Sequence, residues 1–271
     1  MSLDLDRITH PLRLAQGSHR EGSGKGCAMN VISYINGDTK ITDFPACSAR
    51  PLARMVQSLN DNLAGGDGFL SPENSVIVLD LGWLTVGTAD TPREVIWRWL
   101  ADLLVHPEMG VVTRVRREDV ARSLRGVAAL CKREACGERV PVAEWRAACG
   151  DARKAKEDAY AAAAAAAAAY AAAAADAYAA AVADAYAYAD AYADAAAYAY
   201  AAAAAAAYAD AYAYAYAYTF AAAYAYAGAD ADARIAFTRW AIKHWRDLAG
   251  LGDCTDIDAP AVDTALARIG G

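Results

Sequence analysis

The sequence predicts an all-α protein, and two observations carry this prediction. From residue 159 to residue 233 every odd-numbered position is alanine except Thr219, and no Lys, Arg or Pro interrupts these 75 residues. Alanine has the highest helix propensity of all residues and is depleted in strands. Outside this stretch, apolar residues recur at helical spacing and are bounded by helix start and stop signals. We therefore expect a compact helical domain with a long helical excursion.

The stretch 159–233, called the Ala-X segment below, carries Tyr, Asp or further Ala at most even positions. In a helix these positions step by about 200°, so Tyr and Asp surround the whole circumference. The alternative is a silk-like strand with one bare alanine face. A sheet would need regular hairpin turns, yet no Gly, Pro or Asn occurs between residues 159 and 227. Helix is favoured, and five tyrosines are candidate binding residues: Tyr186, Tyr192, Tyr200, Tyr208 and Tyr216.

Several helix boundaries can be read directly from residues 1–158. A short helix is expected from Cys27 and is closed by Gly37. Ser48 is a possible cap for a second helix over residues 51–63. Ser71 precedes a proline suited to the first helical position, and Thr91 with a glutamate three residues later forms a capping box that opens a helix to about residue 105.

Later elements are also helical, with one exception. Residues 118–133 predict an amphipathic helix, and another begins near residue 142 and runs into the Ala-X segment. The exception is the apolar run 75–81, which is consistent with a buried strand, although one strand alone makes no sheet.

After the Ala-X segment, the apolar residues between 235 and 248 mark an amphipathic helix that ends at Gly250. We expect its apolar face to dock on the N-terminal part. The predicted organisation is a helical domain over residues 1–158, the Ala-X segment over 159–233, and a C-terminal helix and tail over 234–271.

Charge is unevenly distributed along the chain. The whole net charge of −7 lies on the Ala-X segment, which holds seven Asp and no base. Residues 111–156 hold twelve bases against six acids. One interpretation is a nucleic-acid surface that includes Arg114, Arg116 and Arg117. The alternative, which we favour, is a solvated helix face or a basic surface complementary to the acidic segment of the same or a neighbouring chain.

Several short motifs carry a resemblance to a known group. They are the run from His10 to His19, the stretch from Gly26 to Met29, residues 43–47, residues 59–61 and residues 86–88, followed later by residues 237–240 and 247–250. In these motifs the chain resembles an uncharacterised group of proteins from actinobacteria and their bacteriophages, mycobacteriophages in particular. Phage members similarly carry Ala-rich insertions with Tyr and Asp before the closing helix. The resemblance implies a phage provenance and no established activity.

One pair of residues is a candidate for catalysis. Cys27 follows three glycines and is expected at a helix N-terminus, where the dipole and free amides lower the pKa of a thiol. His19 lies eight residues earlier and could act as its base in nucleophilic catalysis. The alternative is a small buried thiol beside a capping histidine. The glycines do not have the spacing of a phosphate-binding loop.

The remaining signals predict no metal, cofactor or membrane span. The six cysteines and four histidines lack the close pairing of a zinc site. The first residues have neither a basic start nor an apolar run, so we expect no signal peptide, a cytoplasmic location in the host bacterium and free thiols. The Asp and Tyr side chains of the Ala-X segment argue against a membrane helix.

These observations favour a non-enzymatic interaction or structural protein. It would act through the Ala-X segment, by self-association as a homo-oligomer or by binding a host or phage protein. The two alternatives are a cysteine-dependent enzyme that uses Cys27 and His19, and a nucleic-acid-binding protein that uses residues 111–156.

Overall fold

The computed structural model describes residues 5–17, 19, 23–148, parts of 150–158, 231–254 and 256–270. All regular elements in these residues are helices, which confirms the predicted all-α class. The chain divides into two compact units, residues 1–95 with 231–271, and residues 96–230. The boundary therefore lies inside residues 1–158, which the sequence predicts to form one domain.

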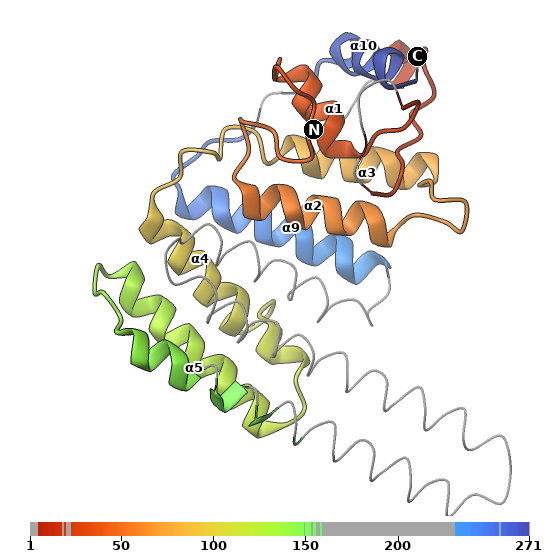
Figure 1. Ribbon diagram of the computed structural model, residues 1–271. Coiled ribbons are helices and arrows are strands. Elements are labelled where there is room, and N and C mark those ends of the chain that lie inside the picture. Colours follow the sequence, from red (N-terminus) through yellow and green to blue (C-terminus); the bar gives the residue numbers. More distant parts are fainter. Residues whose placement is uncertain are drawn as a thin grey trace, which may run out of the picture. The chain divides into compact units, whose positions relative to one another are not determined.

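The first unit is built from five α-helices (Figure 1): α1 (Ala28–Ile35), α2 (Arg50–Asn62), α3 (Pro72–Trp83), α9 (Ala231–Leu248) and α10 (Ala259–Gly270). Helix α1 packs against α2, α3 and α10, and α2 also contacts α9. At the crossing of α1 and α3, a Cβ on Gly82 would lie 3.3 Å from Ile32 and 3.5 Å from the sulfur of Met29. The glycine therefore allows these two helices to approach closely.

The possible strand over residues 75–81 is wrong, because these residues form the body of α3. The Ser71 hydroxyl caps the helix by accepting a hydrogen bond from the Asn74 amide at 3.2 Å, and Pro72 occupies the first turn. The cap and proline predicted from the sequence are thus in place. An apolar run without clear periodicity fits this position because α1, α2 and α9 all contact α3.

The predicted cap at Ser48 is also wrong. Ala49 precedes α2, and its amide donates to the Thr88 hydroxyl at 2.8 Å. The Ser48 hydroxyl instead lies 2.7 Å from the Thr85 hydroxyl. A loop distant in sequence therefore fixes the residue that precedes α2, and no side chain caps the first turn of this helix.

Helix α9 docks on the N-terminal part of the first unit through two polar contacts beside its apolar face. The buried Trp245 indole donates to the Thr91 hydroxyl at 2.9 Å. The Arg246 guanidinium donates to the carbonyls of Leu84 at 3.2 Å and Val86 at 2.9 Å. A cation at the C-terminal end of α3 satisfies carbonyls that lack partners within the helix and interacts favourably with its dipole.

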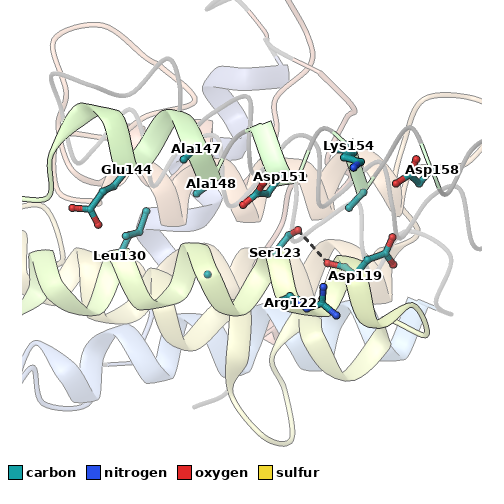
Figure 2. Close-up of a pocket in the computed structure, with 12 residues that line it drawn as sticks. Asp119, Arg122, Ser123, Leu130, Glu144, Ala147, Ala148, Asp151, Lys154 and Asp158 are labelled. Carbon is teal, nitrogen blue, oxygen red and sulfur yellow. Dashed lines mark hydrogen bonds between the residues drawn. The ribbon is translucent and has the colours of Figure 1, made fainter.

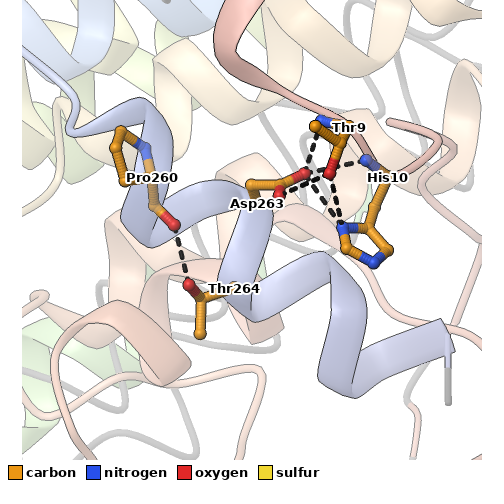
Figure 3. A network of polar contacts seen from close by, with 5 residues as sticks. All are labelled: Thr9, His10, Pro260, Asp263 and Thr264. Atoms are coloured by element: carbon orange, nitrogen blue, oxygen red, sulfur yellow. Dashed lines mark hydrogen bonds and ion pairs between the residues drawn. The ribbon is translucent and has the colours of Figure 1, made fainter.

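Helix α10, which the sequence analysis did not predict, is attached to the N-terminal segment through Asp263 (Figure 3). This carboxylate accepts from the amides of Thr9 at 2.7 Å and His10 at 2.8 Å, and from the Thr9 hydroxyl at 2.8 Å. It also lies 3.0 Å from Nδ1 of His10. The backbone hydrogen bond from His10 is the largest of the causes that hold the pKa of Asp263 well below its usual range.

The second unit contains most of α4 (Arg93–Val105), which crosses the unit boundary, and α5 (Glu118–Ala135), followed by helical residues between 142 and 158. Trp97 of α4 stacks on Trp145 with ring centroids 5.6 Å apart. Arg133 forms ion pairs with both Glu138 and Glu144, which connects the end of α5 to the helical residues that follow.

Replacing Asp263 with Asn should lower the melting temperature at neutral pH, because the amide cannot accept all the hydrogen bonds that the carboxylate accepts. The pKa of Asp263 is lower in the folded than in the unfolded chain. Its contribution to the free energy of unfolding is therefore present above the ordinary pKa of about 4 and is lost as pH falls through the folded-state pKa. The difference in melting temperature from wild type should therefore shrink in acid. Asp256→Asn, at an exposed position, is the control. A difference that stays constant down to about pH 2 would contradict this assignment.

Candidate functional site

Cys27 lies at the N-terminal boundary of α1, as expected from the sequence. Its amide donates to the Asn30 side-chain oxygen at 3.0 Å. Its thiol donates to the carboxylate of Asp43 at 3.5 Å, and the Asn30 amide donates to the same carboxylate oxygen at 2.9 Å. The Gln57 amide from α2 donates to the second oxygen at 3.0 Å. We call Cys27, Asn30, Asp43 and Gln57 the Asp43 network, and all four are buried.

The expectation of a lowered pKa for Cys27 is wrong. Burial raises the pKa of this thiol far above its ordinary value, and the nearby Asp43 carboxylate raises it further. The hydrogen bonds at the start of α1 act in the opposite direction but are weaker causes. With no exposed surface and a protonated sulfur, Cys27 acts here as a donor to Asp43.

His19, the proposed base, has no hydrogen bond to the Cys27 thiol, which donates to Asp43 instead. His19 lines a cavity of about 10 Å³ whose other lining residues are Lys25, Asn30, Tyr34, Ile41, Arg268 and Ile269. Cys27 is not among these residues, so the structure does not place the two side chains around one cavity. Asn30 is common to the cavity and the Asp43 network, but its side chain already binds Cys27 and Asp43.

The three candidate arginines for nucleic-acid binding differ in their surroundings. Arg114 and Arg116 are exposed, whereas Arg117 is half-buried and forms an ion pair with Asp119 at 2.6 Å. The Arg117 guanidinium holds the pKa of Asp119 below its usual value. Arg125 and Arg133 also pair with carboxylates of the second unit. These ion pairs offset part of the positive charge that the composition of 111–156 suggests.

The five candidate tyrosines of the Ala-X segment, from Tyr186 to Tyr216, lie outside the described residues. Among the residues that are described, no group of three or more His, Cys, Asp or Glu side chains is arranged to hold a metal ion. None of the described helices has the length and apolar character needed to cross a membrane.

A groove in the second unit was not anticipated from the sequence (Figure 2). It has a volume of about 640 Å³ and lies between α5 and the helical residues that follow 142. Half of its lining is small or apolar, consisting of Ser123, Gly126, Leu130, Ala147, Ala148 and Ala155. The other half is charged, consisting of Asp119, Arg122, Glu144, Asp151, Lys154 and Asp158.

The spacing of these residues shows why two helices form the groove. The α5 residues recur at intervals of three or four from Asp119 to Leu130, and those on the other side recur similarly from Glu144 to Asp158. Residues at this spacing share one helix face. A search for two adjacent helix faces rich in small residues could have found the groove in the sequence.

Gly126 opens the middle of the groove. A Cβ placed on this glycine would meet no atom within 4 Å. Glycine is unfavourable inside a helix by about 1 kcal/mol relative to alanine, so its position in the middle of α5 has a local cost. The absence of a side chain at Gly126 leaves room for a backbone or a side chain to approach α5.

Comparisons of the chain with protein-family models, with curated proteins and with solved structures gave no match.

Thiol labelling of the native protein should modify Cys136 before Cys27. Cys136 is exposed, whereas Cys27 has no accessible surface and carries a strongly raised pKa. Mass spectrometry after brief treatment with iodoacetamide at neutral pH measures the order. Cys131, buried with a similarly raised pKa, is the internal reference for an unreactive thiol. Labelling of Cys27 before Cys136 would restore the catalytic hypothesis.

Replacing Asp43 with Ala should lower the free energy of unfolding by about 3 kcal/mol or more, because it leaves the donors of Asn30 and Gln57 buried without their acceptor. Denaturant unfolding of the full chain measures this. Asp90→Ala, at an exposed site of the same unit, should change the free energy by less than about 0.5 kcal/mol. Equal effects of the two substitutions would show that Asp43 is not a structural centre.

Proposed function

We propose that this chain is an interaction protein that self-associates, with the groove of one copy accepting the alanine-rich segment of a second copy. The observation that carries the proposal is the groove beside α5, where small side chains and Gly126 leave space between two helix faces. The motifs shared with phage proteins support the further proposal that the chain acts in the cytoplasm of a host bacterium.

The size of the side chains supports a helix as the occupant. Small residues on facing helices let their backbones approach to the lower end of the usual 8–10 Å spacing. The groove offers Gly126, Ala147 and Ala148, and the Ala-X segment, predicted to be helical, offers alanine at nearly every second position. Contact between two such surfaces depends on side-chain volume and tolerates many registers.

The charges of the groove are also compatible with this occupant. Arg122 and Lys154 can pair with Asp side chains, of which the Ala-X segment holds seven without a single base. The four groove carboxylates would repel those Asp side chains but can accept hydrogen bonds from tyrosine hydroxyls. A register that places Asp near the two bases and Tyr near the acids satisfies both groups.

A second copy is favoured over the same chain as the source of the segment. The groove extends to Asp158, and the Ala-X segment begins at the next residue. To enter the groove, a helix continuing from this point would have to reverse its direction. A reversal needs no Gly or Pro, but neither of these residues, which most often mark one, occurs between residues 159 and 227. The segment of a second copy can approach without any turn.

The test is the mass of the full chain by light scattering at two concentrations, compared with two glycine variants. Gly126→Leu places a bulky side chain on the groove at a position where a Cβ would meet no atom within 4 Å, and it should raise the dissociation constant at least about tenfold, which corresponds to about 1.4 kcal/mol. Gly150→Leu is the matched control, because Gly150 is exposed, also has open space around it and does not line the groove.

Three results would contradict the proposal. The first is a strictly monomeric wild type at tens of micromolar. The second is an oligomer whose mass is unchanged by Gly126→Leu, and the third is an oligomer that persists after deletion of residues 160–227. Retained cooperative melting of each variant shows that any loss of mass reflects association and not unfolding.

A further inference from the structure

The small cavity beside His19 contains polar atoms that the described protein leaves without partners. The Nε2 atom of His19 and the hydroxyl of Tyr34 are both buried, and neither has a hydrogen-bond partner among the described residues. Both side chains line the same cavity in the first unit. Buried polar groups normally have a partner, either in the protein or in a bound molecule.

The charges around the cavity indicate the kind of molecule that fits. Arg268 and Lys25 both line it, and no acidic residue does so among the described residues. The Arg268 guanidinium lies 4.7 Å from the centre of the Tyr34 ring and forms no ion pair with a described carboxylate. The Lys25 ammonium lies somewhat apart, 5.3 Å from the centre of the Phe69 ring. Both side chains are exposed to solvent, and they give the described lining a net positive charge.

The remaining lining residues do not provide partners for these atoms. The side chain of Asn30 is already engaged with Cys27 and Asp43, while Ile41 and Ile269 are apolar. Ile269 of α10 packs directly on the glycine-rich segment, where a Cβ on Gly26 would lie 2.8 Å from its Cγ2 atom. Arg268 and Ile269 of α10 thus form one wall of the cavity, and its volume of about 10 Å³ leaves room for a single atom of about the size of a water oxygen, such as one oxygen of an anion that lies at its mouth.

We propose that this cavity is a binding site for a small oxyanion, one oxygen of which enters between His19, Tyr34 and Arg268. The Tyr34 hydroxyl and the Nε2–H tautomer of His19 donate to that oxygen, and the guanidinium neutralises its charge. Hydrogen bonds to an ionised acceptor are stronger than neutral ones, which favours an anion over a water molecule in this positive environment. The site is independent of the groove in the second unit.

Inorganic phosphate is the probe, titrated into the full chain at constant ionic strength set with sodium chloride. Wild type should show a saturable rise in melting temperature with phosphate beyond the chloride reference, because a ligand that binds only the folded state stabilises it. Tyr34→Phe removes a single oxygen atom and Arg268→Gln removes the charge. Each should raise the apparent dissociation constant for phosphate at least about tenfold.

Two variants provide matched controls. Arg50→Gln removes a guanidinium that lies 5.1 Å from the Phe44 ring centre but does not line the cavity. His106→Gln removes a histidine that does not line the cavity and whose Nδ1 atom accepts from the backbone amides of Glu108 and Met109 at 3.3 Å. Both should bind phosphate as wild type does.

The proposal is overturned if phosphate gives no stabilisation beyond chloride, in which case a water molecule is the occupant. It is equally overturned if Tyr34→Phe and His19→Gln melt cooperatively and keep the full phosphate response. If Arg50→Gln loses the stabilisation by phosphate to the same extent as Arg268→Gln does, the effect is general charge screening, and a specific site is refuted.

Discussion

The buried carboxylate of Asp43 is the constraint on which the first unit depends. A charged group out of contact with water is unfavourable by several kcal/mol unless hydrogen bonds replace its hydration. Its donors come from Cys27 and Asn30 at the start of α1 and from Gln57 in α2. All three can reach the carboxylate only when α1 and α2 hold one relative position.

The same position determines the packing of the other helices of this unit. Asn60, one turn after Gln57, accepts from the Ala28 amide at 3.3 Å and donates to the Ala15 carbonyl at 2.9 Å. The N-terminal segment is thereby held against the start of α1, and its earlier residues in turn hold α10 through Asp263. A chain of polar contacts links helices that are more than 200 residues apart in sequence.

The sequence predicted elements whose signals are local. The Ser71 cap with Pro72 and the glycine stop after α1 depend only on neighbouring residues, and the structure contains both. What it could not predict depends on distant partners. The start of α2 is held through a hydrogen bond from the Ala49 amide to Thr88, and the run 75–81 becomes a helix in contact with three other helices.

Cys27 shows this limit most clearly at the level of chemistry. Glycines and a helix N-terminus are features of reactive cysteines, and both are present. The deciding quantities are burial and the carboxylate of Asp43, sixteen residues away in sequence. Neither is visible in the local motif, so a position that favours thiolate formation holds a protonated thiol instead.

The groove of the second unit tolerates more substitutions than the Asp43 network of the first unit. In the Asp43 network each side chain has a specific partner, so few substitutions can preserve the contacts. A groove lined by glycine, alanine and serine requires only that the opposing surface be small and able to approach.

That difference explains how a low-complexity segment can be compatible with specific association. In the proposed association, an alanine at nearly every odd position supplies small side chains in any register, so insertion or loss of Ala-X pairs would change the length of the contact surface without changing its chemistry. The specificity of the proposed contact would then come from the charged positions. Arg122 and Lys154 form no ion pair with a described carboxylate, whereas Arg117, Arg125 and Arg133 do.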